Sequence, residues 1–293
     1  AYRVLDERMK IAKKPIFPIL PSILTAKEEI EEFISRGRVF FSDEVVFGNA
    51  LCRVYNQPAP APESPELPKV DVAKIRSVID NSKDGYLAPS CIRDLLDSCG
   101  IPRAGEAVVK SADKAAEAAS KLGFPVVMKV VGPVHKSDVG GVVLNVRNEE
   151  QARKEFDRMI RIPQTTAILI QPMLSGVELF AGAKYEPKFG HMILCGLGGV
   201  FIEVLKDVRA GLAPLSKDEA LNMIHGLKGY KIIKGVRGQK GIDEMKFADI
   251  IQRLSALVKA APEIVELDFN PLLGKEESIT VVDARVRIEK SAL

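Results

Sequence analysis

The chain has 293 residues, of which 46% are hydrophobic and 28% are charged, and its formal net charge is +3 at pH 7. This length suits two domains of roughly 100–200 residues each, and the composition allows a sizeable core. The small net charge, with basic residues scattered among acids, argues against nucleic acid as a partner. No apolar run approaches the about 18 residues of a membrane span, and no signal-peptide pattern is seen, so we expect a cytoplasmic protein without a membrane partner.

The four cysteines form no C-x-x-C pair and lie in apolar or helical patterns; they are Cys52, Cys91, Cys99 and Cys195. This usage predicts reduced, buried thiols of a cytoplasmic protein.

The first 55 residues have the pattern of the end of a domain. We expect a helix over Glu28–Arg36, a short strand over Val39–Phe41 and a helix over Val45–Tyr55. These elements supply too few strands for a sheet, so residues 1–55 are predicted to be the tail of an α/β domain. Because the chain starts in mid-pattern, we expect a fragment or one subunit of a larger protein.

A proline-rich stretch follows, with prolines at positions 58, 60, 62, 65 and 68. Each proline fixes φ and lacks a backbone donor, so the stretch predicts an extended, semi-rigid linker. We place the linker at residues 56–70 and a second domain at residues 71–293.

The second domain mixes helix and strand patterns. Asn148 can cap one helix, Ser216 with Glu219 forms a capping box for another, and Gly123 ends a third. Helices are expected over Pro89–Cys99, Ala112–Leu122, Glu149–Ile160 and Phe247–Lys259. Strands are expected over Glu106–Val109, Pro125–Val131, Val142–Val146, Ala167–Gln171, Val177–Tyr185, Met192–Cys195, Ile264–Phe269 and Ile279–Asp283.

A lysine and a glycine-rich loop stand at the end of one apolar strand. Lys129 is costly to bury unless it meets an anion, and Gly140 and Gly141 follow in the loop. Glycines allow backbone N–H groups to approach phosphate closely. The segment therefore indicates phosphate binding, and the alternative is a lysine reaching solvent beside an ordinary glycine turn.

His135 lies inside this loop. Imidazole can act as a nucleophile toward phosphorus, and the neighbouring Lys136 would offset phosphate charge. The alternative is an ordinary surface histidine.

Two further segments have weaker signals. The strand that ends in Gln171-Pro172-Met173 could present backbone groups to an adenine edge, and Glu178 could accept from ribose hydroxyls, although a buried strand with a turn explains both. The glycines near Gly198 lack the G-x-G-x-x-G spacing and precede a strand pattern, so we reject a dinucleotide fingerprint there.

Oxygen donors gather near the C-terminus. Asp268 and Asn270 are two apart on a strand and share one face, and Asp283 ends the next predicted strand. Such a set suits Mg²⁺, which takes a few protein ligands plus substrate phosphates. The alternative is the polar edge of a hairpin.

Taken in order, these segments resemble an ATP-grasp domain. More narrowly, the chain is similar to the β part of ADP-forming acetyl-CoA (acyl-CoA) synthetases, relatives of succinyl-CoA synthetase. The resemblance covers roughly Asp71 to Lys290 and rests on "HKSDVGGV", "GLGGVFIEVLKD", "KGVRGQKG" and "ELDFNPLL…VVDAR". It implies an α/β (α+β ATP-grasp) fold with two ATP-grasp subdomains, preceded at residues 1–55 by a partial flavodoxin-like tail of the CoA-ligase domain.

The resemblance also implies roles for individual residues and two cofactors, ATP/ADP and Mg²⁺. His135 matches a phosphohistidine, and Asn270 and Asp283 would ligate the metal. Where the family commonly has an arginine this chain has Gly211, with Arg209 two residues earlier; either Arg209 substitutes for it or the phosphate contact is weakened. The residues expected to contact nucleotide are Lys129, Gly140, Gly141, Gln171, Pro172, Met173, Glu178, Arg209 and Arg237.

The implied function is the nucleotide-binding part of an ADP-forming acyl-CoA ligase that passes phosphate between His135 and ADP/ATP. The other histidines, His191 and His225, have structural patterns, and none lies in residues 1–55. We therefore expect a partner, either a domain or a subunit, that carries the CoA site, the acyl-CoA substrate and the first phosphohistidine. We also expect an oligomer.

Two other functions remain open at this point. One is a regulatory module that binds nucleotide without turnover. The other is an ATP-grasp ligase that joins a carboxylate to an amine or thiol without needing His135.

Overall fold

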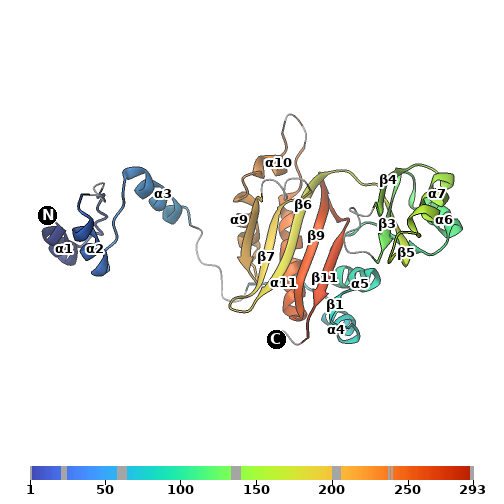
Figure 1. Ribbon diagram of the computed structural model, residues 1–293, viewed down its shortest axis with the longest axis horizontal. Helices are drawn as coiled ribbons and strands as arrows, with labels where there is room; N and C mark the ends of the chain where they lie inside the picture. Colours follow the sequence, from blue (N-terminus) through green and yellow to red (C-terminus); the bar gives the residue numbers. More distant parts are fainter. Residues whose placement is uncertain are drawn as a thin grey trace. The chain divides into compact units, whose positions relative to one another are not determined.

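The protein is described by a computed structural model that covers residues 2–20, 25–57, 65–132, 140–199, 206–236, 238 and 240–290. The chain divides into two compact units, Ala1–Pro60 and Ala61–Leu293 (Figure 1). That the first unit is the tail of a ligase domain stays a prediction. Among the described residues, no helix has the length and apolar character needed to cross a membrane.

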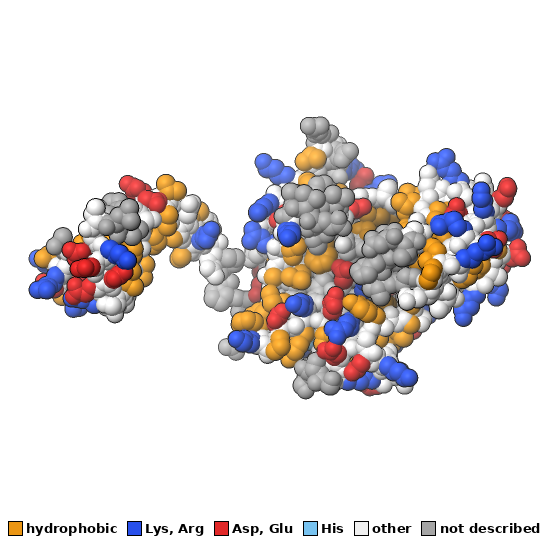
Figure 2. Space-filling model, in the orientation of Figure 1, with side chains coloured by type: hydrophobic (Ala, Val, Ile, Leu, Met, Phe, Trp, Pro, Cys, Tyr) orange, Lys and Arg blue, Asp and Glu red, His pale blue; other side chains and the backbone are white. Residues whose placement is uncertain are grey.

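The first unit consists of short helices. They are α1 (Tyr2–Ile11), α2 (Lys27–Ser35) and α3 (Glu44–Tyr55). The strand expected over 39–41 was wrong, because only Phe41 pairs, in a single parallel bridge with Ile19. Helix α3 buries none of its residues, and Figure 2 shows hydrophobic side chains gathered along it.

Asp6 ties α1 to the rest of this unit. Its side chain is 2% exposed and accepts from Arg38 Nε at 2.7 Å and from Arg36 Nη1 at 3.2 Å, while Lys10 Nζ lies at 3.1 Å. These cations, Arg38 first, lower the pKa of the Asp6 carboxyl from 3.8 to about 2. The carboxylate therefore stabilises the folded unit above pH 4, and that contribution is lost as the pH falls through 2.

Replacing Asp6 with asparagine is expected to loosen α1 and α2 at pH 7, because three cations lose their shared carboxylate. Hydrogen exchange of the amides of these helices, corrected for intrinsic pH dependence, should be faster in Asp6→Asn than in the parent at pH 7. The difference should shrink as the pH falls toward and through about 2, the pKa of the Asp6 carboxyl in the folded unit. The exposed Glu7→Gln serves as the matched control, and an equal response of both variants would contradict the role of Asp6.

The second unit contains two antiparallel sheets. The smaller has the order β2-β5-β3-β4 and the larger the order β1-β11-β9-β6-β7-β8, with β10 paired to β9. The small-sheet strands are β2 (Ala107–Val109), β3 (Val126–Val131), β4 (Val142–Val146) and β5 (Ala167–Pro172). The large-sheet strands are β1 (Gly85–Tyr86), β6 (Val177–Glu186), β7 (Gly190–Leu197), β8 (Val208–Leu212), β9 (Ile264–Lys275), β10 (Ser278–Val281) and β11 (Ala284–Ile288).

Each sheet has its own core, built where helices cover one face. Helices α6 and α7 pack against the small sheet around Met128 and Ile170, and α11 and α9 pack against the large sheet around Phe247 and Phe269. The helices that the structure describes in this unit are α4 (Val72–Asn81), α5 (Pro89–Cys99), α6 (Ala112–Leu122), α7 (Glu149–Met159), α9 (Lys217–His225), α10 (Tyr230–Lys234) and α11 (Glu244–Ala260). Two separate cores leave the other faces of the two sheets available to form a site.

The caps predicted from sequence are confirmed. Asn148 accepts from Gln151 N at 2.8 Å, and Ser216 and Glu219 form a reciprocal capping box. The sequence analysis did not predict α4, α10, β1, β8 or β11, and it ended two C-terminal strands at the wrong places. Strand β9 continues past Pro271 to Lys275, and β10 ends at Val281.

The prediction of buried thiols was right for two of the four cysteines. Cys99 and Cys195 are buried, and burial raises the pKa of each thiol to about 12, which keeps them protonated. Cys52 is exposed on α3, and Cys91 is partly exposed.

Candidate functional site: the faces between the two sheets

The small sheet has one face packed against helices and one face with polar residues. Met128 on β3 and Ile170 on β5 lie in the core, whereas the alternate residues Lys129, Leu169 and Gln171 point to the opposite face. Both polar side chains are nevertheless buried: Lys129 is 7% exposed and Gln171 is 4% exposed. They are covered by residues of the large-sheet subdomain.

Lys129 connects the two subdomains. Its Nζ donates to the carbonyl oxygen of Val282 at 3.2 Å, in the short connection between β10 and β11. Asp283 is the next residue in that connection, so it does not end a strand as the sequence suggested; it stands two residues after β10 and directly before β11. The geometry brings the predicted phosphate lysine next to the segment that carries the predicted metal ligand.

A second group forms where β6, β7 and β9 lie side by side. Asn270 Oδ1 on β9 accepts from Gly199 N at 3.2 Å, just after β7, and the backbone oxygen of Glu178 on β6 accepts from Gly198 N at 2.8 Å. The Glu178 carboxylate lies directly against Gly199, where an added Cβ would be 1.5 Å from Glu178 Oε2. Glu178 and Asn270 are thus brought together by the glycines between them.

Gly199→Ala is expected to destabilise the protein through its backbone conformation and to move the exposed Glu178 carboxylate aside. Gly199 has a φ of +57°, which costs an L-residue about 1–2 kcal/mol, and the new Cβ would also displace the Glu178 carboxylate. For a unit of this size we expect thermal unfolding to fall by roughly 2–8 °C. Gly190, with a φ of +77° and nothing within 4 Å of an added Cβ, provides the control for the backbone cost; a much larger loss in Gly199→Ala than in Gly190→Ala would contradict the expectation that the Glu178 carboxylate moves aside.

Asp268 extends this acidic and amide group along β9. Asp268 and Asn270 alternate with the buried Leu267 and Phe269, so they share a face as predicted. Burial raises the pKa of the Asp268 carboxyl to about 6; Arg285 opposes this rise, and the nearby charges of Asp283 and Glu266 add to it. Because the charge of Asp283 raises the pKa of Asp268, the two carboxyl groups interact electrostatically.

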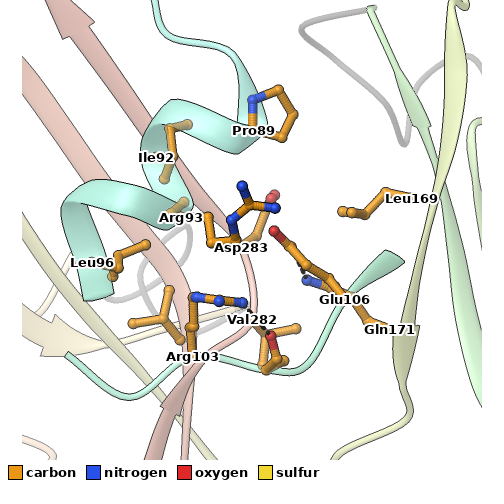
Figure 3. Close-up of a pocket in the computed structure, with 13 residues that line it drawn as sticks. Pro89, Ile92, Arg93, Leu96, Arg103, Glu106, Leu169, Gln171, Val282 and Asp283 are labelled. Carbon is orange, nitrogen blue, oxygen red and sulfur yellow. Dashed lines mark hydrogen bonds between the residues drawn. The ribbon is translucent and has the colours of Figure 1, made fainter. Parts of the chain in front are cut away.

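A polar pocket lies between the subdomains and was not predicted (Figure 3). Gln171 Nε2 donates to Glu106 Oε2 at 3.3 Å, and both side chains point into the pocket that Asp283 also lines. Burial raises the pKa of the Glu106 carboxyl, although Arg103, the Gln171 hydrogen bond, Arg93 and Lys129 act against the rise. The sequence signal was slight, since Glu106 was noted only as the start of a short strand.

Several other predicted residues have defined places. Pro172 ends β5 and Met173, 40% exposed, begins the connection to β6, so the segment joins the two sheets. Gly140 has a φ of +66°, and the Gly141 carbonyl accepts from Val130 N at 2.8 Å at the start of β4.

Arg209 lies apart in the large sheet from Asn270 and Glu178, two of the predicted residues that the structure describes. It lies on β8, at the opposite edge of the large sheet from β11, and its Nε donates to the Gly226 carbonyl at 2.7 Å. The interpretation of Arg209 as a phosphate contact therefore lacks support from its position. His135 and Arg237 fall outside the described residues.

The other two histidines have structural contacts, as their patterns suggested. The His191 ring lies 2.7 Å from the Ile264 carbonyl, and His225 lies 2.8 Å from Glu244.

Comparison with known proteins identifies the fold. Residues 79–288 match the family model of the ATP-grasp domain. The β subunit of acetate–CoA ligase [ADP-forming] I from Pyrococcus furiosus is 37% identical over 227 residues, which are 73% of this chain and 98% of that subunit. Acetate–CoA ligase [ADP-forming] II from Archaeoglobus fulgidus is 43% identical over 195 residues, 66% of this chain but only 29% of that longer protein.

A solved structure supports the same family. Acetyl-coenzyme A synthetase 1 of Ca. Korarchaeum cryptofilum, in complex with coenzyme A and Ca-AMPCP, aligns with a TM-score of 0.68 at 37% identity, covering 73% of this chain and 97% of that one. The chain therefore belongs to the ATP-grasp family, among the homologues of the β subunits of ADP-forming acetate–CoA ligases.

Proposed function

We propose that this chain is the nucleotide-binding part of an ADP-forming acyl-CoA ligase of the acetate–CoA type, and that it transfers phosphate between His135 and ADP/ATP. The observation that carries the proposal is the arrangement between the sheets: Lys129 from the small sheet reaches the connection that holds Asp283. Relatives that match this chain over nearly their whole length are named as β subunits of such ligases.

The residues between the sheets suit a nucleotide. Lys129 is a buried cation on the face of the small sheet opposite α6 and α7. A phosphate bound there would contact the Lys129 ammonium group with little competition from water. Gln171, Pro172 and Met173 would border the base, and Glu178 would hold the ribose hydroxyls. The buried Oε1 of Gln171 has no hydrogen-bond partner among the described residues, as expected of an atom that meets a ligand.

The donor set at the large sheet suits Mg²⁺. The side-chain oxygens of Asn270 and Asp283 would hold the ion, which prefers oxygen ligands and usually takes only one or two from the protein. When bound, the ion would balance charge on the phosphates. Asn270 Oδ1 is already held by Gly199 N at 3.2 Å, and that contact would orient the amide toward the ion.

The proposed transfer uses His135 as the nucleophile. Its imidazole nitrogen would attack the terminal phosphorus of ATP as the bond to the ADP oxygen breaks, and the reverse step would return the phosphate to ADP. Lys129 would bind phosphate oxygens during either step. Gly140 and Gly141 would lie beside the phosphates.

A partner would supply the remaining chemistry. This chain spans the Pyrococcus β subunit but only 29% of the single-chain Archaeoglobus enzyme, so a CoA-binding and ligase part is expected on another chain or domain. That part would carry the first phosphohistidine and bind the acyl-CoA. We expect the partners to assemble into an oligomer in the cytoplasm.

The proposal is tested by calorimetric titration of the purified chain with ADP and ATP in the presence of Mg²⁺, together with an assay of acetate- and CoA-dependent ATP consumption. We expect nucleotide binding without ligase turnover by the chain alone. Failure to bind either nucleotide would overturn the proposal. Full turnover by this chain would disprove the need for a partner.

A further inference from the structure

A cavity of about 320 Å³ lies between the two subdomains, beside the polar pocket. Its walls are mostly apolar: Leu169 and Val131 come from the small sheet, and Leu87, Ile92 and Val286 come from the large-sheet subdomain. Figure 3 shows Leu169 across from Ile92 of α5. At ~30 Å³ for a water-sized group, the cavity has room for roughly ten non-hydrogen atoms. Such a size and lining are typical of a site for a small organic molecule.

One cation faces this apolar space. Among the described residues that line the cavity, Arg285 on β11 is the only charged one, and it is partly buried. Its guanidinium has no hydrogen-bond or ion-pair partner in the part of the chain that the structure describes. Asp268 lies opposite it on β9 and interacts with it through charge alone, whereas Arg287, two residues along β11, pairs with Glu289. The N–H donors of Arg285 are therefore available to a molecule in the cavity.

The lining and the charge together favour one class of ligand. A guanidinium can donate two parallel hydrogen bonds to a carboxylate, and the apolar walls stabilise a hydrocarbon body by removing it from water. A phosphate dianion fits less well, because one arginine would balance only part of its charge and the carboxyl of Asp268 lies opposite that arginine. The cavity is thus suited to a monoanion with an apolar body.

We infer that this cavity binds a small carboxylic acid with an apolar body, its carboxylate on Arg285, and that the bound acid raises the affinity of the chain for nucleotide. The walls belong to both subdomains, so an occupant contacts both and stabilises their close arrangement. The coupling rests on the proposed function, in which the nucleotide lies between the same two sheets. Coupling of two binding sites is reciprocal, so nucleotide should tighten the binding of the acid by the same factor.

Phenylacetate is the probe, because it joins a carboxylate to an apolar ring in about ten non-hydrogen atoms, the capacity of the cavity. Calorimetric titration of the full chain without nucleotide should give saturable binding with a Kd of roughly 0.1–1 mM. Acetate lacks the apolar body and phenethyl alcohol lacks the charge, so each should bind at least about tenfold more weakly. Inorganic phosphate at the same concentration should not displace phenylacetate.

Two variants test the assignment to this cavity. Arg285→Met removes the charge and keeps a long apolar side chain, so phenylacetate should bind roughly 10–100-fold more weakly. Ala88→Leu enlarges an exposed lining residue just before α5, and should weaken binding by filling the space. Arg287→Met is the matched control, since Arg287 does not line the cavity, and should bind phenylacetate like the parent. Thermal unfolding establishes that each variant is folded.

A second titration measures the coupling. ADP with Mg²⁺ should bind the parent about fivefold or more tightly when phenylacetate is saturating, and the same concentration of phenylacetate should change ADP affinity little in Arg285→Met.

The outcomes separate this inference from the proposed function. No saturable binding of phenylacetate, or binding that both cavity variants retain, would overturn the acid site. Unchanged ADP affinity in saturating phenylacetate would overturn the coupling, and weakened ADP affinity would show that the acid occupies the nucleotide site instead. Failure of the parent to bind any nucleotide would overturn the proposed function and the coupling, whereas the titration without nucleotide would still decide whether the cavity binds the acid.

Discussion

Replacing His135 with alanine is expected to abolish phosphorylation of the chain. If His135 is the phosphate carrier, the parent incubated with γ-labelled ATP and Mg²⁺ will acquire protein-bound phosphate that is labile in acid and stable in base. Alanine has no nucleophile, so label in His135→Ala should fall by about a thousandfold or more, to background. Nucleotide affinity should change little, since the histidine acts on phosphorus and does not hold the base or ribose.

The control for this experiment is His225→Gln. His225 lies on α9, with 47% of its side chain exposed, and contacts Glu244 rather than residues between the sheets. This variant should be labelled like the parent. Equal labelling of His135→Ala and the parent would remove His135 from the mechanism and point to another acceptor. An unlabelled parent that still binds nucleotide would favour a regulatory module that binds nucleotide without turnover.

The sequence predicted best where a local pattern is tied to one structural outcome. The caps at Asn148 and Ser216 and the apolar strand around Met128 are such cases, because capping and burial depend on neighbouring residues in the chain. Strand β8 and helix α10 were missed because they are short and their patterns are weak. Their formation depends on pairing with β7 and on packing against the large-sheet core, which no local window contains.

The candidate site was predicted in part for the same reason. Lys129 could be predicted because a cation at the end of an apolar strand either contacts an anion or extends into solvent. The fold buries the Lys129 side chain. Glu106 has no such signal, since it lies in a loop before a three-residue strand. Its importance emerges only when β5 brings Gln171 beside it, a contact 65 residues apart in sequence. Arg209 was predicted from the resemblance alone, and its role in phosphate binding stays a prediction.

Replacing Lys129 with methionine is expected to weaken ADP binding by a chain that still folds. Methionine has nearly the same length and keeps the strand face filled, but it removes the charge that would bind phosphate. A charge-assisted hydrogen bond is worth about 1.5–3 kcal/mol, so ADP affinity should fall by roughly 10–100-fold. The free energy of unfolding is expected to fall as well, because the buried hydrogen bond from Lys129 Nζ to the carbonyl oxygen of Val282 is lost.

The matched control for Lys129→Met is Lys184→Met on β6. Lys184 has a side chain that is 64% exposed and pairs with Glu186 at 3.0 Å, so its removal should alter neither ADP affinity nor thermal unfolding by a measurable amount. A Lys129→Met protein that unfolds like the parent yet binds ADP equally well would place the phosphates elsewhere. A variant that loses affinity only because it unfolds would lack a thermal unfolding transition above the binding temperature, whereas a phosphate contact predicts weakened binding by a protein that is still folded at that temperature.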